Sequence, residues 1–479
     1  MKSSFFEYQV AMSGLFTARA NLNIVGHNIA NAAMPGYSRQ VSIQKASRPL
    51  TLNNGKGMYG TGSEVYGVRQ IRDIYLDRKY WSQKAILGEY TTKNDHLAMM
   101  ETVFNDLGDT GIRTAFTDFF SRLQDLTTNT PDATYRTNVI MAADTLAEMI
   151  RTNAEALQKQ QIDLNQEVEG VVERINSLGA QITSLNRQIY QYEIDGSNAN
   201  DLRDQRARLV DELSEYVNVS VEERDYSRED LPYDKRFTLQ INGYDFVNHF
   251  DNQSLVCVPR DDQRGTITID GKEYPTGTKK NIMDVPNLYD LYIDGTGTEF
   301  DIYSPTLQGT LKGIIDVRDG NNGDMTMPDG APAEQTTTYK GVPFYLNKLN
   351  SLCRVFARAI NEGRDAKGNE IPDVTGHMTG YDKYAIDTGT PSGRLLITAM
   401  SGATDQLKDP MSGDLIVIDF PNTTIDANIT ADYDGVDYGA LNCLNIAVNP
   451  ELTEDPYLLA CNSAATIGES NNDVILGFT

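Results

Sequence analysis

Cysteine and histidine, the residues most often used for metal binding and nucleophilic catalysis, are few and widely spaced in this chain. The cysteines are Cys257, Cys353, Cys443 and Cys461, and the histidines are His27, His96, His249 and His377. No two cysteines have C-x-x-C spacing, and no cysteine lies near a histidine in sequence. Four cysteines in 479 residues are also too few for a disulfide framework. We therefore predict neither a metal site nor a cofactor.

Two glycine-rich or acidic motifs resemble ligand-binding loops. A G-x-G-x-x-G motif spans 55–60, but turn residues precede it and β-like sequence follows it. A dinucleotide site needs a strand before the motif and a helix after it, so we interpret 55–60 as a hairpin loop. The run at 316–330 is similar to a calcium loop, but its twelfth position from Asp319 is Gly330, where such a loop needs a glutamate. Since the common catalytic motifs are also missing, we predict that the chain is not an enzyme.

The charge balance argues against nucleic acid and membrane surfaces as partners. Acidic residues outnumber basic ones 67 to 42, which gives a net charge of −25. An acidic surface repels phosphate backbones and anionic lipids. No run of 18 apolar residues is present, so we predict no membrane insertion. The N-terminus MKSSFFEYQVAMSGLF has no apolar h-region, which argues against a cleaved signal peptide.

The N-terminal segment is predicted to form a helix over 5–33, ended by Pro35 and Gly36. Its apolar residues recur in steps of three and four, as in the stripe of a coiled coil. The positions that we assign to a candidate assembly interface are Leu15, Ala18, Leu22, Val25 and Ile29. A helix at the end of a chain has no obvious internal partner for such a stripe, so we expect other subunits to cover it.

A second helical region is predicted to begin near Asn94 and to continue past Thr130, with Thr130 as the N-cap of a long helix. We expect 133–192 to be one continuous helix packed against 200–217 and 344–361. Fifty residues of helix span roughly 75 Å, which implies an elongated bundle. Among fifteen heptad positions from Ala143 onwards, only Gln161 is polar. The bundle seam is predicted at Leu164, Val168, Val171, Ile175, Leu178, Ile182, Leu185 and Ile189.

After residue 218 the pattern changes to short alternating segments separated by turn residues, which predicts β structure. The expected fold is α+β and multidomain: an elongated antiparallel α-helical coiled-coil bundle with inserted all-β domains. The expected divisions are an N-terminal helix with a short β extension (1–93), a helical arm (94–218), a β-rich insertion (219–342), a return helix (343–365), a second β-rich segment (366–450) and a tail (451–479).

The segment ANLNIVGHNIANAAMPGYSRQ, residues 20–40, resembles the N-terminal signature of bacterial flagellar axial proteins, which form the rod, the hook and the hook-associated structures. The residues that match this signature are Asn28, Asn31, Pro35, Gly36, Tyr37, Arg39 and Gln40. His27 and Met34 depart from it, at positions where the family pattern has Asn and Thr.

Further segments resemble the flagellar hook-associated protein 1 family. NDLRDQRARLVDELSEYVNVSVE (200–222) is similar to the family's return helix, and 307–319, 346–370 and 444–460 are similar to its later signatures. The long helical arm is a feature that rod and hook proteins lack. Family members close with an amphipathic helix that pairs with the N-terminal one, whereas this chain stops at Thr479. We therefore expect either a truncated chain or an unusual member.

This resemblance implies a structural component that joins hook to filament and is required for filament assembly. It implies that the partners are copies of the chain in a helical junction, the hook protein, the next hook-associated protein and, before secretion, an export chaperone. It also implies type III export without a cleaved signal, to an extracellular site at the hook–filament junction. Two alternatives are another axial protein of the hook or distal rod, and an acidic extracellular adhesin or enzyme with its activity in the β insertions.

Overall fold

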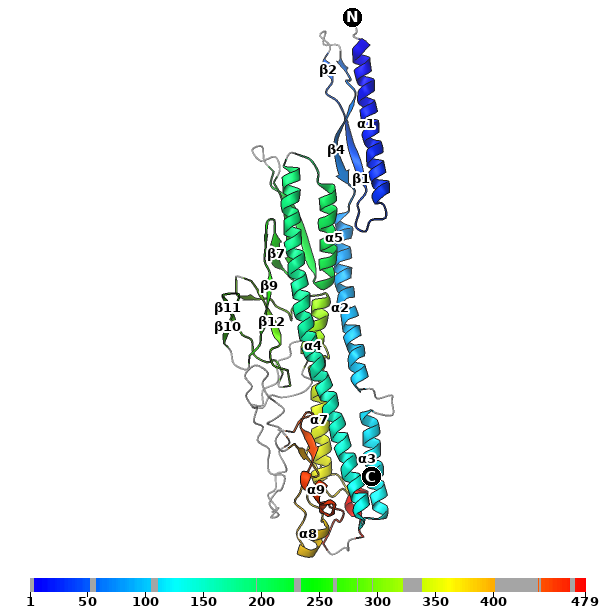
Figure 1. The fold of residues 1–479 in the computed structure, drawn as a ribbon, viewed down its shortest axis with the longest axis vertical. Helices are drawn as coiled ribbons and strands as arrows, with labels where there is room; N and C mark the ends of the chain where they lie inside the picture. The colour runs from blue at the N-terminus through cyan, green and yellow to red at the C-terminus, as the bar shows by residue number, and fades with distance from the viewer. Residues whose placement is uncertain are drawn as a thin grey trace.

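The chain forms an elongated body in which a small N-terminal unit sits at one end of a long helical rod (Figure 1). The computed structural model describes all residues except 1–3, 52–56, 105–110, 195, 228–233, 262–264, 282, 295, 322–337, 401–437, 439–440 and 466–469. The described part is α+β, with long helices and several small antiparallel sheets. No helix within these ranges is long and apolar enough to cross a membrane.

The N-terminal unit consists of one helix laid along a β-hairpin. Helix α1 (Ser4–Asn31) packs on β1 (Gln40–Ala46) and β4 (Ser63–Gln70), which pair antiparallel. Thr17 is the buried contact point, and its hydroxyl lies 3.2 Å from the Ser63 carbonyl oxygen. Strands β2 (Leu50–Thr51) and β3 (Met58–Tyr59) pair antiparallel, which places the glycine motif at a hairpin, with β3 inside the motif. The first part of the motif lies outside the described residues.

Helix α2 (Ile74–Phe104) shows that the predicted start near Asn94 is wrong, together with the boundary between 93 and 94, which falls inside this helix. Over 74–88, α2 has no leucine stripe on its buried side, where Trp81 is the one large buried side chain among the described residues. Leu76 and Leu87 are exposed, whereas the contact surface contains Ala85 and Gly88. A Cβ on Gly88 would lie 2.4 Å from the Glu215 carbonyl oxygen, so small residues, and not a leucine stripe, bring α2 close to the bundle.

Helix α4 (Ala133–Glu193) confirms the prediction of one continuous helix over 133–192. Its 61 residues span roughly 90 Å at 1.5 Å per residue. It packs against α3 (Ile112–Thr128), α5 (Asn200–Tyr216) and α7 (Val342–Glu362), as Figure 1 shows. The predicted cap is wrong, because Asp132 is the N-cap and its carboxylate accepts a hydrogen bond from the Thr134 amide.

The predicted seam of α4 is buried along most of its length. Seven of its eight residues are at most 8% exposed, namely Leu164, Val168, Val171, Ile175, Leu178, Ile182 and Ile189. Leu185 is only half-buried, and Asn186 takes the inward position beside it. A straight helix has 3.6 residues per turn, so a stripe that repeats every 3.5 residues gradually rotates around it. Polar residues therefore occupy some of the positions at which α4 contacts its neighbours. Gln161 is fully buried, and its side chain bonds Asp284, the Arg318 carbonyl and the Val285 amide.

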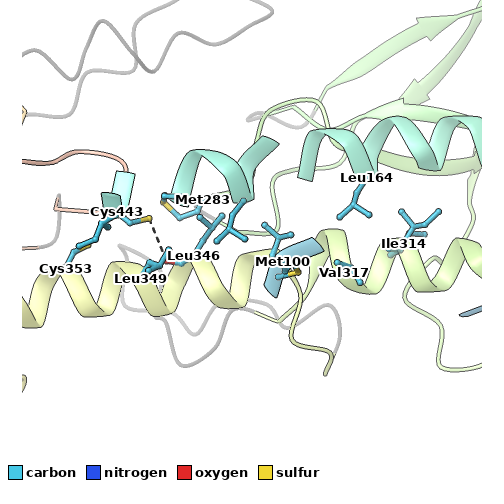
Figure 2. Close-up of a cluster of buried hydrophobic side chains, with 14 of the residues drawn as sticks. Met100, Leu164, Met283, Ile314, Val317, Leu346, Leu349, Cys353 and Cys443 are labelled. Carbon is cyan, nitrogen blue, oxygen red and sulfur yellow. Dashed lines mark hydrogen bonds between the residues drawn. The ribbon is translucent and has the colours of Figure 1, made fainter. Parts of the chain in front are cut away.

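Helix α6 (Thr310–Asp319) lies inside the predicted β insertion 219–342 and belongs instead to the rod. It contacts α2 and α4, and Figure 2 shows Leu164 of α4 pointing toward Ile314 and Val317 of α6. Farther along the rod, Leu346, Leu349 and Cys353 of α7 continue this core (Figure 2). With only ten residues, α6 contains too short an apolar run for its period to distinguish a helix from a strand.

The β structure between 219 and 299 flanks the C-terminal half of α4. The strands are β5 (Val219–Asp225), β6 (Lys235–Ile241), β7 (Tyr244–Asn248), β8 (Asp251–Asn252), β9 (Leu255–Pro259), β10 (Thr266–Ile269), β11 (Lys272–Pro275), β12 (Tyr289–Ile293) and β13 (Thr298–Glu299). They form a four-stranded sheet in the order β5-β6-β7-β8, a three-stranded sheet β13-β12-β9 and a β10-β11 hairpin. Every pairing is antiparallel.

A buried ion network attaches the three-stranded sheet to the rod. Asp319, at the end of α6, accepts hydrogen bonds from Arg260 at 2.8 Å, from Arg318 at 2.8 Å and from the Tyr303 hydroxyl at 2.6 Å. Arg260 also pairs with Asp290 of β12 at 2.9 Å. Burial alone would raise the pKa of Asp319, but the charges of the two arginines hold it well below its usual range. The acidic run that resembled a calcium loop thus begins in this ion network, and 322–337 lies outside the described residues.

The remaining chain covers the end of the rod opposite the N-terminal unit (Figure 1). Its elements are α8 (Lys383–Thr388), β14 (Ile397–Ala399), β15 (Ile446–Val448), α9 (Pro450–Glu454), a 3-10 turn (Pro456–Leu458) and α10 (Asp473–Phe478). Within the described part of 366–450, the strands are short, and loops and α8 make up most of the segment, in contrast to the predicted β-rich character. Residues 401–437 of this segment lie outside the described residues.

Candidate functional site

The predicted assembly stripe lies on the outer side of α1. Leu15, Leu22 and Ile29 are 62%, 71% and 73% exposed, and Val25 and Ala18 are also exposed. The opposite side of α1 faces the hairpin through polar residues, with Asn28 bonded to the Gln40 backbone. The helix therefore meets its own chain through hydrogen bonds and presents its apolar side chains to the exterior.

The signature residues close the turn that follows α1. The Asn28 amide donates to the Gln40 carbonyl at 2.9 Å, and its oxygen accepts from the Gln40 amide at 2.9 Å and the Tyr37 hydroxyl at 2.8 Å. Asn31 donates to the His27 carbonyl at 3.0 Å. The bonds of Asn28 tie the end of α1 to the turn that follows it and to the first residue of β1.

The same turn is fastened to α5 of the rod. The Ser38 amide donates to Asp204 at 2.9 Å, and the Gln40 side chain donates to Asp201 at 2.8 Å. Gly36 has a positive φ of 74°, and a Cβ there would lie 2.3 Å from the Arg208 side chain. We call this contact between the turn 34–40 and α5 the joint. Pro35 is exposed in the same turn.

The sequence did not reveal the two aspartates of the joint, because α5 was interpreted only through its apolar face. The available signal was the spacing of Asp201 and Asp204, which puts both carboxylates on one side of the helix. Sequence alone, however, does not show that 34–40 lies against that side. Burial and the charges of Asp201 and Asp204 raise the pKa of Tyr37, so its hydroxyl stays protonated and remains a donor to Asn28.

Arg72 links the joint to the start of α2. Its guanidinium lies 2.6 Å from Asp77, 3.8 Å from Asp204 and 4.0 Å from Asp211. Asp211 also accepts from the indole of Trp81 at 2.6 Å, and its burial raises the pKa of this carboxyl. One arginine therefore holds carboxylates of both α2 and α5, which fixes the point at which the N-terminal unit leaves the rod.

Shallow grooves surround the joint. A cavity of about 200 Å³ is lined by Met34, Tyr37 and Arg208 among others, and a groove of about 580 Å³ continues from it between α4 and α5. In the part of the chain that the structure describes, no three His, Cys, Asp or Glu side chains gather as metal ligands would. The four cysteines are free, and burial raises the pKa of Cys257, Cys443 and Cys461 to about 12, 12 and 11.

Asp204→Ala is expected to loosen the joint. The substitution leaves the half-buried Ser38 amide without its acceptor, which costs about 1 kcal/mol of local stability. Amide hydrogen exchange of a peptide covering 36–41 should become faster, while exchange in α4 stays unchanged. Gln205→Ala, at the exposed neighbouring position, is the control. Unchanged protection of 36–41 in Asp204→Ala would contradict the role assigned to this carboxylate.

Comparison with known proteins identifies the family. Residues 97–370 match the family model described as the flagellar hook-associated protein FlgK helical domain. Flagellar hook-associated protein 1 of Bacillus subtilis is 30% identical over 393 residues, which cover 79% of this chain and 72% of the relative. The proteins of the same name from Escherichia coli and Salmonella typhimurium are 28% and 31% identical, over 76% of this chain and 58% of each relative.

A solved structure of the flagellar hook junction protein FlgK from Burkholderia pseudomallei is also similar, with a TM-score of 0.45 and 18% identity over 68% of this chain and 47% of that one. The chain thus spans little more than half the length of several relatives that it matches. The family model alone covers more than half of the chain, and it includes α3, α4, α5, α6 and α7. The chain therefore belongs to the flagellar hook-associated protein 1 family.

Proposed function

We propose that the chain is a structural component of the bacterial flagellum that joins hook to filament and is required for filament assembly. The observation that carries this proposal is the exposed apolar stripe of α1, at one end of an elongated body in a chain of this family. Each of the four large side chains, Leu15, Leu22, Val25 and Ile29, would contribute about 1.5–3 kcal/mol of binding free energy when a partner covers it. The stripe is therefore a source of binding energy that becomes available on assembly.

The partners proposed are copies of this chain in a helical junction, the hook protein and the next hook-associated protein, with an export chaperone before secretion. The stripe lies at one end of the subunit and would contact a different surface of the neighbouring subunit. Such heterologous contacts build open helical assemblies. We further propose type III export without a cleaved signal peptide, and an extracellular location at the junction. No catalytic role is part of this proposal.

The alternatives have less support. A hook or distal-rod protein would not require the helical region at 97–370 that matches the hook-associated family model. An adhesin or enzyme with its activity in the β insertions would need a reactive site there. In the described residues of these insertions, the buried Arg260 pairs with Asp290 and Asp319, and the buried Asp284 carboxylate accepts hydrogen bonds from Gln161 and Asn281.

Leu22→Glu tests the proposal. A charge at this 71% exposed position should leave the folding of 94–450 nearly intact, because Leu22 contributes little to the isolated chain. In the assembly the same charge would be buried without a partner, so filaments and swimming should be lost. Swimming and electron microscopy of filaments measure the effect, and circular dichroism checks the fold. Gln9→Glu adds the same charge to α1 away from the stripe and should swim normally. Normal swimming of Leu22→Glu would overturn the proposal.

A further inference from the structure

Charge is distributed very unevenly between the N-terminal unit and the rest of the chain. Residues 1–72 contain eight Lys and Arg but only two Asp and Glu, so this unit carries a charge of +6. Because the whole chain carries −25, the other 407 residues carry −31. A basic end on a strongly acidic body is attracted to the body of another copy.

Some of these basic residues lie on the outer face of the β1–β4 hairpin, Lys45 and Arg69 among them. Ser42 and Ser63 face α1, since they bond Asn21 and Thr17. Side chains alternate along a strand, so Val41, Ile43 and Lys45 of β1 lie on the opposite face, together with Arg69, which pairs with Val41. Figure 1 shows α1 along one side of the hairpin only.

This outer face combines positive charge with exposed apolar and aromatic groups, as protein interfaces do. Arg39, Lys45 and Arg69 are exposed, and the Lys45 ammonium lies 3.8 Å from the centre of the Tyr66 ring. Tyr66 is 67% exposed and Ile71 is 48% exposed. Lys45 pairs with Glu64, but Arg39 and Arg69 form no ion pair with any residue that the structure describes.

An acidic strip lies along the rod on the exposed side of α4. Its carboxylates belong to Asp144, Glu148, Glu155, Glu169 and Glu173, all of them exposed. Their spacing places them on one side of the helix, together with two positive charges, the exposed Lys159 and the half-buried Arg151, which donates to the Ile446 carbonyl. None of the five acids is in an ion pair among the described residues, so the strip is available to an external cation.

We propose that the outer face of the β1–β4 hairpin binds the acidic strip of α4 on a second copy of this chain. The inference rests on the proposed function in that it describes one contact of the assembled protein. It uses a different surface from the apolar stripe of α1, so the two can fail separately. The occupant is a second copy because this chain itself carries the complementary charge, whereas nucleic acid or anionic lipid would be repelled by the other 407 residues.

Self-association of the purified chain, measured by sedimentation velocity, is the test. Weak association is expected at about 0.05 M salt and should weaken at least about tenfold at 0.5 M, where the Debye length is only a few ångströms. Arg39→Glu with Arg69→Glu should weaken association at low salt by about tenfold or more. Lys79→Glu with Arg113→Glu is the matched control, because it reverses two exposed charges on the rod and should change association less than about twofold.

Reversing the charges of the acidic strip on a second chain should restore the association lost in the hairpin variant, which would identify the strip as the partner surface. A mixture of Arg39→Glu/Arg69→Glu with Glu148→Lys/Glu155→Lys should associate more strongly than the hairpin variant alone. A chain that stays monomeric at low salt, or a hairpin variant that associates like the unmodified chain, would overturn the inference. So would a mixture with no recovery. Binding of the hairpin face to anionic vesicles or to DNA, without self-association, would also overturn it. None of these results bears on Leu22→Glu and swimming, which test the proposed function.

Discussion

Leu178→Asp is expected to destabilise the helical rod by at least about 5 kcal/mol. Leu178 is fully buried in the seam of α4, where the helix packs against α5 and the four-stranded sheet. Removing a buried leucine side chain costs about 3–5 kcal/mol, and the aspartate adds a buried charge with no partner. Since a domain is typically stable by only about 5–15 kcal/mol, this substitution removes a large part of the total.

Urea unfolding followed by circular dichroism measures the loss. Gln181→Asp is the matched control, since it introduces the same charge on an exposed position of the same helix, three residues away, and should change the free energy of unfolding by less than about 1 kcal/mol. Leu178→Ala separates the two causes, because it removes the apolar contact without adding charge. A midpoint that is unchanged in Leu178→Asp would contradict the packing of this seam.

Asp319→Asn is expected to cost about 3–5 kcal/mol, because it leaves buried arginine charge without its carboxylate. Arg318 is fully buried, and among the described residues its carboxylate partner is Asp319, while its other bonds go to Asn165 and the Tyr289 carbonyl. Arg260 keeps Asp290. The loss should appear as a lower free energy of unfolding in urea at pH 7. Asp301→Asn, at an exposed position nearby, should be close to neutral.

A double variant tests whether the stability lost in Asp319→Asn comes from the unpaired arginine charge. Arg318→Met with Asp319→Asn removes both charges, so it should lose less stability than Asp319→Asn alone. The pH dependence has a defined sign. Because the folded chain lowers the pKa of Asp319, the carboxylate contributes stability above about pH 4 and loses it as the pH falls. The Asn variant should lack this part of the acid dependence, and an equal acid dependence in both chains would contradict the network.

The sequence alone determined the elements whose apolar residues repeat over many turns. The continuous helix at 133–193 could be predicted because its stripe persists through more than ten turns, so no alternative structure buries the same residues. The outward-facing stripe of α1 was also visible in the sequence, since Leu15, Leu22 and Ile29 recur every seven residues. Such information is local, because it depends only on spacing along one segment.

Tertiary structure alone decided where contacts are made by small, polar or fully surrounded residues. The packing of α2 on α5 depends on Gly88 fitting against a backbone carbonyl, and α6 is only ten residues long, so neither helix has a long apolar repeat at its contact. The joint brings Ser38 to Asp204 across 166 positions, and Gln161, the one polar seam residue, finds its partners in Asp284 and Arg318. Hydrogen bonds and close approaches of this kind depend on the three-dimensional path of the chain, which the residue types and their spacing along one segment do not contain.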